Sequence, residues 1–286
     1  ILQGDCYDEA YAKAMEICEQ EGATSLHPFD DYEVMAGQGT VALEILSELP
    51  TVDTVIVPVG GGGLISGVSA CIKQVNPRVR VVGVQAEGAS AVYQSYRAGR
   101  HMSTDGVSTI ADGIAVGNPG EKTVAEILKY VDDMVTVSDN DISSAILLLM
   151  ERTKQIVEPS GASSLAAVLS GKVDAHERKT VCLLSGGNID VSFIHRVIDQ
   201  GLVSRHRRLK FTVRLPDAPG KLIAMLQVVS DSGANILMID HDRLSNVLGP
   251  SEILVHVACE VGGEEHGRSV IASLSNCGYT VTTEQQ

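Results

Sequence analysis

The sequence contains no tryptophan, few other aromatic residues and no long apolar run. Its 286 residues include 7 Tyr and 3 Phe. The longest apolar patches, such as residues 145–150, are far shorter than the roughly 20 residues that a membrane-spanning helix needs. With 44% hydrophobic residues, the composition is typical of a globular protein and predicts no membrane partner.

Positive charge is scarce. The chain has 22 Lys and Arg against 36 Asp and Glu, which gives a net charge of −14 and an isoelectric point near 4.9. An acidic surface does not attract nucleic acid or anionic lipid. The basic segment 205–210 is more consistent with a linker that pairs with the chain's own carboxylates. These features predict a small-molecule ligand and no nucleic-acid partner.

Motifs for metal binding and redox chemistry are absent. The chain has no C-x-x-C and no H-E-x-x-H, so we expect no metal. Cys71, Cys182 and Cys259 lie in apolar runs, which predicts buried, reduced thiols. The other cysteines are Cys6, Cys18 and Cys277. Free thiols favour a reducing compartment, and we expect a cytoplasmic protein.

Residues 1–203 alternate between strand-like and helix-like segments. The apolar, β-branched runs are typical of strands buried on both faces; they cover residues 54–59, 79–84 and 180–184. Helical periodicity covers residues 8–19, 38–49 and 64–75, and a longer helix, capped by Ser138 or Asp139, is expected to reach Val157. This alternation predicts an α/β fold with a mostly parallel sheet and helices on both faces.

The pattern changes in the last third of the chain. After a linker at 204–208, residues 209–286 predict the order strand, helix, strand, strand, helix, strand, a ferredoxin-like module. Pro219 fits the first position of its first helix, and the second strand is expected over residues 235–244.

Four consecutive glycines, Gly60 to Gly63, join a predicted strand to a predicted helix that starts at Leu64. Backbone N–H groups at such a hinge favour an anion, and phosphate is the usual one. No Lys-Ser or Lys-Thr pair follows, so the hinge is not a P-loop. A dinucleotide site stays open: Gly61 and Gly63 fit its fingerprint, Ser66 replaces the third glycine, and Glu87 is a candidate ribose ligand.

A second glycine-containing hinge, Ser185-Gly186-Gly187-Asn188, follows another predicted strand. In a parallel sheet such hinges share the edge formed by the carboxyl ends of the strands. One hinge offers backbone donors and the other a neutral hydroxyl. The pair suits a cofactor with a phosphate at one end and a ring nitrogen at the other.

Several motifs resemble, in order and spacing, those of the fold type II pyridoxal-phosphate (PLP) enzymes, which have a tryptophan-synthase-β-like fold. The motifs are Gln38-Gly39-Thr40, residues 57–64, Ile110-Ala111-Asp112-Gly113, Glu158-Pro159 and Ser185-Gly186-Gly187-Asn188. Residues 209–286 resemble an ACT regulatory domain. Together the chain resembles a threonine ammonia-lyase, with residues 1–28 as the end of the family's smaller lobe.

The resemblance implies roles for particular residues. Gly60, Gly61, Gly62, Gly63 and Leu64 would hold the cofactor phosphate. Ser185, with Gly186 and Asn188, would serve the pyridine nitrogen, and Glu158 would be a catalytic carboxylate beside the ring. The implied reaction converts L-threonine to 2-oxobutanoate and ammonia, with L-serine as a secondary substrate and a place in isoleucine biosynthesis.

The ACT-like part implies an amino-acid effector bound across two copies, in an even-numbered homo-oligomer (a dimer or tetramer). The residues implied are Asp217, Pro219, Gly220, Asn235 and Ile236. The same prolines and glycines are equally consistent with ordinary helix ends. Glu87 matches a residue that helps to bind a divalent cation in racemase-like members of the family. The second carboxylate of that metal site has no counterpart in this sequence. Asp112 is as consistent with a local turn as with a site.

The family's Schiff-base lysine lies in a Ser-x-Lys-x-Arg-Gly stretch that this sequence does not contain. The family places that stretch upstream of the first residue here, and the chain does not begin with Met. We expect the 286 residues alone to bind PLP weakly and to leave threonine intact. Serine racemase, serine dehydratase and a non-catalytic amino-acid sensor are the alternatives.

Overall fold

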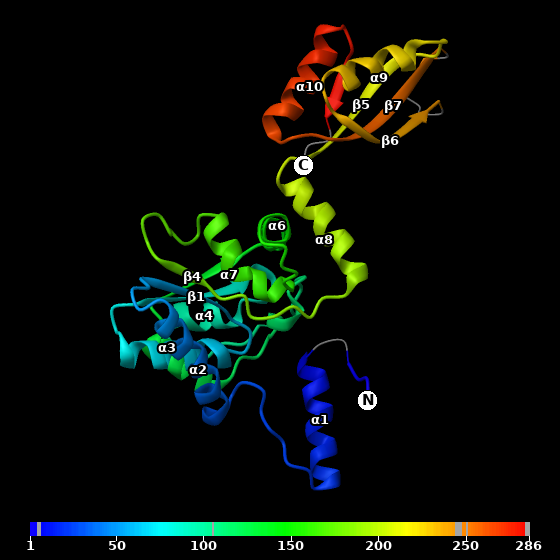
Figure 1. Cartoon of the computed structure of the whole chain (residues 1–286). Coiled ribbons are helices and arrows are strands. Elements are labelled where there is room, and N and C mark those ends of the chain that lie inside the picture. Colours follow the sequence, from blue (N-terminus) through cyan, green and yellow to red (C-terminus); the bar gives the residue numbers. More distant parts are fainter. Residues whose placement is uncertain (5–6, 105, 244–247, 250, 284–286) are drawn as a thin grey trace. The chain divides into compact units, whose positions relative to one another are not determined.

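The computed structural model describes residues 1–4, 7–104, 106–243, 248–249 and 251–283 (Figure 1). Cys6 and Leu244, which enter the predictions above, lie outside the described residues. The chain divides into two compact units, Ile1–Ile198 and Asp199–Gln286. This division falls inside helix α8 (Val191–Ser204) rather than after residue 203.

The first unit contains a four-stranded sheet in the order β3-β2-β1-β4, with all three neighbouring pairs parallel. Its strands are β1 (Thr54–Pro58), β2 (Arg80–Ala86), β3 (Asp133–Val137) and β4 (Thr180–Cys182). Its helices are α1 (Tyr7–Glu21), α2 (Tyr32–Glu48), α3 (Gly63–Val75), α4 (Ala91–Ala98), α5 (Glu121–Tyr130), α6 (Asp139–Arg152) and α7 (Pro159–Leu169), with short 3-10 turns η1 (Glu87–Ala89) and η2 (Asp112–Ile114). The predicted parallel α/β fold is confirmed.

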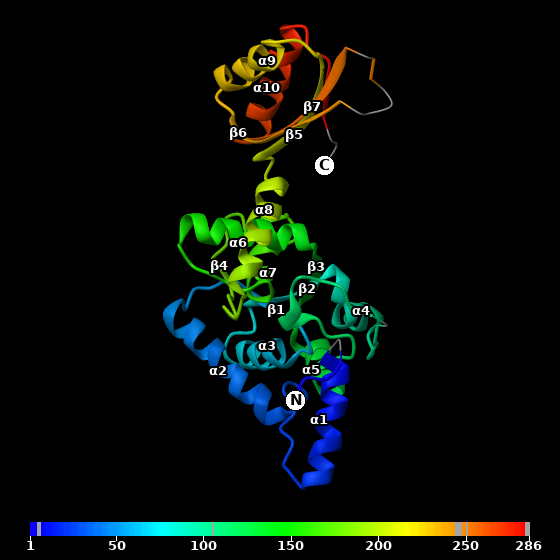
Figure 2. The same cartoon turned by 90° about the vertical axis from the view of Figure 1, so that its right-hand side faces the viewer.

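Helices cover both faces of this sheet. Figures 1 and 2 show α6 and α7 on one face and α2 and α3 on the other. Side chains alternate along the strands because successive residues point to opposite faces. Ile56 packs with α6 and α7, whereas its neighbours Val55 and Val57 pack with α3. The sheet is therefore buried on both sides, and its carboxyl edge is the place where the connecting hinges meet.

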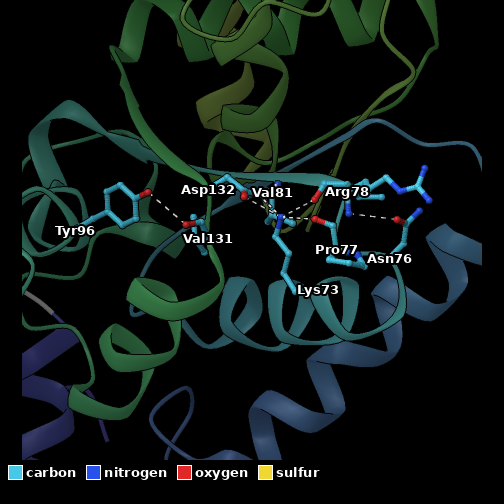
Figure 3. Close-up of polar contacts among 9 residues, drawn as sticks. Lys73, Asn76, Pro77, Arg78, Val81, Tyr96, Val131 and Asp132 are labelled. Carbon is cyan, nitrogen blue, oxygen red and sulfur yellow. Dashed lines mark hydrogen bonds and ion pairs between the residues drawn. The ribbon is translucent and has the colours of Figure 1, made fainter.

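Polar contacts fix the opposite, amino-terminal edge of the sheet (Figure 3). Lys73, in the last turn of α3, donates to the carbonyl of Val79 at 2.8 Å and forms an ion pair with Asp132 at 2.6 Å. The Asp132 carboxylate also accepts the amide of Val81 at 2.6 Å. These bonds tie the end of α3 to the starts of β2 and β3.

Two helices of the first unit differ from their predicted limits. Helix α2 begins at Tyr32 rather than Gln38, because the Asp31 carboxylate caps it by accepting the amide of Glu33 at 2.7 Å. Helix α6 starts after Ser138 in a capping box but ends at Arg152, not Val157. Lys154 has a left-handed backbone with φ of 60°, which ends helical geometry before Pro159 is reached.

The second unit has the predicted element order, on an antiparallel sheet ordered β6-β7-β5-β8. After α8 its elements are β5 (Arg208–Pro216), α9 (Lys221–Asp231), β6 (Asn235–Asp242), β7 (Glu252–Glu260), α10 (Glu264–Asn276) and β8 (Val281–Thr283). Phe211, Met225 and Leu274 are buried in its core. Pro219 was predicted as the first helical residue, which is wrong: Gly220, with φ of 84°, is the N-cap and α9 starts after it.

The five described cysteines are free. Cys259 is buried as predicted, but Cys71 and Cys182, which were also predicted to be buried, are only half-buried. In the described part of the chain, no helix is long and apolar enough to cross a membrane.

Substitution of Lys73 by Met is expected to lower the free energy of unfolding of the first unit by about 1–2 kcal/mol, because a carbonyl and a carboxylate lose their donor. Urea unfolding followed by circular dichroism measures this change. The control is Lys13→Met, which breaks the exposed pair with Glu16 at 2.6 Å and is expected to cost less than about 0.5 kcal/mol. Equal losses in the two variants would contradict a structural role for the Lys73 contacts.

Candidate active site

A cavity of about 440 Å³ lies at the carboxyl edge of the first unit's sheet. Its walls bring together Gly60 to Leu64 from the first hinge, Ser185 from the second, and Glu158. Residues 57–64 and residue 185 are far apart in the sequence, and the parallel order of β1 and β4 makes their ends neighbours. The two hinges therefore share one cavity, as the sequence predicts.

The first hinge presents unused backbone donors. Helix α3 starts at Gly63 without a side-chain cap, and Gly62 has φ of 100°, which favours glycine. Among the described residues, the amides of Gly61, Gly62, Gly63 and Leu64 have no backbone acceptor. Orphan amides at a helix N-terminus and the helix dipole together favour a bound anion.

Contacts inside the protein also require these glycines. A Cβ atom on Gly61 would lie 2.6 Å from the ring of Phe29, and one on Gly63 would lie 2.9 Å from the Cα atom of the same residue. A Cβ atom on Gly60 would lie 3.1 Å from the Cα atom of Ile114. Phe29 thus packs directly against two of these glycines, a contact that the glycine pattern did not predict.

Glu158 is fixed against the second hinge. Its amide donates to the Gly186 carbonyl at 3.1 Å, and its carboxylate accepts the Asn188 amide at 2.8 Å. A Cβ atom on Gly186 would lie 2.5 Å from the Glu158 carboxylate oxygen. Gly186 and Asn188 thus contact Glu158, while Ser185 itself faces the cavity with an exposed side chain.

Ser160, in the first turn of α7, also lines the cavity. It is 2% exposed, and its hydroxyl has no hydrogen-bond partner among the described residues. A Cβ atom on Gly113 would lie 2.9 Å from that hydroxyl oxygen. A buried hydroxyl without a partner costs about 1–3 kcal/mol, and since this one lines the cavity, a polar ligand or water there would supply its partner.

The residues present fit a phosphorylated cofactor. Four orphan amides lie at one part of the wall, and the hydroxyls of Ser160 and Ser185 lie at others. The volume is within the range of about 300–1,000 Å³ typical of small-molecule sites. Cys182, which precedes the second hinge, is no nucleophile at neutral pH, because burial raises its pKa to about 11.

Glu87 and Asp112 lie at different places. Glu87 opens η1 and lines a separate polar hollow with Ser90 and Thr104, which weakens its assignment as a ribose ligand of the tetraglycine cavity. The described residues contain no group of three or more His, Cys, Asp or Glu side chains that would hold a metal. Asp112 both lines the cavity and accepts the amide of Gly113 at 2.8 Å, so it serves its own turn.

The five proposed effector residues do not form one site within a single chain. Arg208 and Asn235 both oppose Glu260, so β5 and β6 start at the same end of the sheet. Asp217 and Gly220 follow the other end of β5. The Arg243 guanidinium holds Asp217 there at 3.0 and 3.1 Å. The nine-residue length of β5 separates Asp217 and Gly220 from Asn235 by about 25–30 Å. Pro219 lies with Asp217 and Gly220, and Ile236 lies with Asn235.

The fold and the cavity define an enzyme-like cofactor site on a parallel α/β sheet, and comparison with known proteins gives the family. The profile described as "Pyridoxal-phosphate dependent enzyme" matches residues 1–186. The chain belongs to the family of pyridoxal-phosphate dependent enzymes.

Individual relatives show which enzymes of this family the chain resembles. The chain is 45% identical to the L-threonine ammonia-lyase of Geobacter sulfurreducens over 283 residues, and 44% identical to that of Thermotoga maritima over 281. Each alignment covers 98% of this chain and 70% of the relative. These homologues are lyases, and the prediction of a lyase-type PLP enzyme family is confirmed.

Solved structures agree with this fold. The processed form of tomato threonine deaminase isoform 2 is similar with a TM-score of 0.65 and 37% identity, over 70% of this chain and 56% of the tomato chain. Maize serine racemase gives a TM-score of 0.63 and 34% identity, over 72% of this chain and 64% of its own. The chain thus spans a little over half to about two thirds of the length of these structures.

Proposed function

We propose that this chain forms the cofactor-binding and regulatory parts of a PLP-dependent L-threonine ammonia-lyase, which converts L-threonine to 2-oxobutanoate and ammonia. The observation that carries the proposal is the shared cavity, with orphan amides at one hinge and Ser185 at the other. The relatives named for this activity align with 98% of the chain, hence with both units. That span favours the ammonia-lyase over serine racemase.

In this proposal the amides of Gly61 to Leu64 bind the cofactor phosphate at the N-terminus of α3. The bound cofactor supplies an electron-withdrawing ring that acidifies the α-hydrogen of an amino acid joined to it. Ser185 would donate a hydrogen bond to the ring nitrogen and, being neutral, would not protonate it. A moderately electron-withdrawing ring of this kind would suit loss of the β-hydroxyl of threonine or, secondarily, of serine.

Glu158 holds a carboxylate at a fixed position in the cavity wall, where it would lie beside the bound ring. Its bond to the Asn188 amide restrains one oxygen, and the absence of a side chain at Gly186 leaves space for the other. Ser160 offers a hydroxyl that gains a partner when the cavity is filled. Phe29 packs against the glycines of the phosphate-binding hinge and lines the same cavity.

The C-terminal unit is proposed as an ACT-type domain that binds an amino-acid effector between two copies. Strand β6 is an edge strand, and its Leu237, Met238 and Ile239 are 42%, 56% and 38% exposed. Antiparallel pairing of two β6 edges would bring Asn235 of one copy to the Asp217–Gly220 end of the other. This pairing would cover the exposed side chains and explain why one copy separates the two groups.

Substitution of Ser185 by Ala is expected to weaken binding of PLP to the 286-residue chain by about 3- to 10-fold, because the ring nitrogen loses a donor. Equilibrium dialysis measures the dissociation constant. The control is Ser144→Ala, since Ser144 donates to the Asn140 carbonyl at an exposed position of α6. Equal affinities of the two variants, or no saturable binding of PLP, would contradict the cofactor site.

The chain alone, supplied with PLP and L-threonine, is expected to form no 2-oxobutanoate. No lysine is among the described residues that line the cavity, and the proposed enzyme needs one to carry the cofactor. The measurement is a coupled assay for 2-oxobutanoate with L-threonine and L-serine as substrates. Formation of 2-oxobutanoate above the level without protein would show that a lysine of this chain carries the cofactor. The assignment of the Schiff-base lysine to a Ser-x-Lys-x-Arg-Gly stretch would then be wrong.

Association through β6 is tested by analytical ultracentrifugation of the whole chain. A dimer or tetramer is expected, and Met238→Glu should shift it toward monomer, because a charge would be buried at the proposed edge. Glu substitution at Ile223, which is 72% exposed on α9, is the control and should leave the assembly intact. A wild-type chain that stays monomeric at all concentrations contradicts the proposal.

A further inference from the structure

We infer that Thr123, in the first turn of α5, orients the phosphate-binding amide of the tetraglycine hinge and is a positioning residue for the cofactor site. The inference rests on the proposed function, because it concerns how that phosphate is held. Thr123 is fully buried and comes 62 residues after the carbonyl that it contacts. It lies outside the sequence motifs of the two hinges.

The contact acts on one peptide group. The Thr123 hydroxyl donates to the carbonyl of Gly61 at 2.6 Å, and the amide of Gly120 approaches the same oxygen at 3.4 Å. In a trans peptide the C=O of one residue and the N–H of the next point in opposite directions. With the Gly61 carbonyl directed at α5, the amide of Gly62 is directed away from α5. The cavity lined by Gly60 to Leu64 lies against this hinge.

The backbone conformation of Gly62 matches this arrangement. Its φ of 100° is one that side-chain-bearing residues rarely adopt. A Cβ atom on Gly62 would lie 2.9 Å from the Cβ atom of Thr123. Thr123 therefore occupies the space beside Gly62 and holds the carbonyl that precedes it, so a single side chain restrains the peptide on both sides.

Thr123 is itself held in place by two groups from distant parts of the chain. Helix α5 has Gly120 as its N-cap and no side-chain cap there, and the Asp30 carboxylate accepts the Thr123 amide at 3.0 Å instead. The Ser66 hydroxyl of α3 donates to the Thr123 carbonyl at 3.1 Å. Asp30 therefore fixes the first turn of α5, and this turn fixes the hinge.

Such an arrangement predicts an effect on phosphate binding in particular. When the Thr123 hydroxyl is removed, the Gly61–Gly62 peptide loses its main restraint, and the amide no longer points steadily at the anion. A ligand without phosphate does not use that amide. The ratio of the affinities for PLP and for pyridoxal, which lacks the phosphate, therefore separates orientation of the hinge from general damage to the fold.

The experiment measures dissociation constants of PLP, pyridoxal and inorganic phosphate for the whole chain carrying Thr123→Val. We expect the affinities for PLP and phosphate to fall about tenfold, with pyridoxal changed less than about twofold, and Thr123→Ser to restore the wild-type values. The matched control is Thr54→Val in β1, because Thr54 is 1% exposed and its hydroxyl has no partner among the described residues. This control should change none of the three affinities.

The outcomes separate the inference from the proposed function. If the wild-type chain does not prefer PLP to pyridoxal, the phosphate site itself is wrong. If the wild-type chain shows the preference and Thr123→Val retains it, or loses both ligands equally, only the inference fails. Should Thr123→Val not fold, Asp30→Ala, which removes the acceptor of the Thr123 amide, replaces it, with Asp31→Ala, which removes the side-chain cap of α2, as its control. Asp30→Ala must then lower the preference for PLP, and an unchanged preference overturns the inference.

Discussion

The orientation of four unpaired amides at the start of α3 is the constraint on which the candidate site depends. The amides of Gly61 to Leu64 have no backbone acceptor among the described residues, and the Gly61 carbonyl, which shares a peptide group with the Gly62 amide, is held by Thr123. Phe29 and Ile114 pack against the same hinge and exclude side chains there. An anion is the ligand that such a helix start favours, and the other polar groups of the cavity are arranged relative to it.

The two edges of the first unit's sheet differ in how their polar groups are paired. At the amino-terminal edge, Lys73 and Asp132 satisfy one another and nearby backbone groups. At the carboxyl edge, the amides of the first hinge and the hydroxyl of Ser160 are left without partners, whereas Glu158 is fixed by Asn188. The contacts at the amino-terminal edge thus join elements of the unit to one another, whereas the cavity at the carboxyl edge offers unpaired amides and a hydroxyl to a ligand or water.

The second unit shows a comparable contrast between a closed core and an open edge. Phe211, Met225 and Leu274 fill its interior, yet the adjoining edge strand β6 exposes three consecutive apolar side chains. An exposed apolar edge strand is a ready template for pairing with another chain. The antiparallel geometry of that pairing would supply the proximity of Asn235 to Asp217 that a single copy lacks.

The sequence by itself determined the parallel α/β sheet, the two hinges and their meeting at one edge, because buried β-branched runs and glycine breaks are local signals and parallel strands end together. It placed the ends of α2 and α6 wrongly, since a cap at Asp31 and a left-handed Lys154 override periodicity. Only the tertiary structure showed the contacts of Asp30 and Thr123 at the first hinge, and that the Ser160 hydroxyl has no partner among the described residues. The contacts of Asp30 and Thr123 join residues up to 93 positions apart, and Ser160 is distinguished only by a hydroxyl without a partner among the described residues. Neither feature leaves a pattern in the sequence.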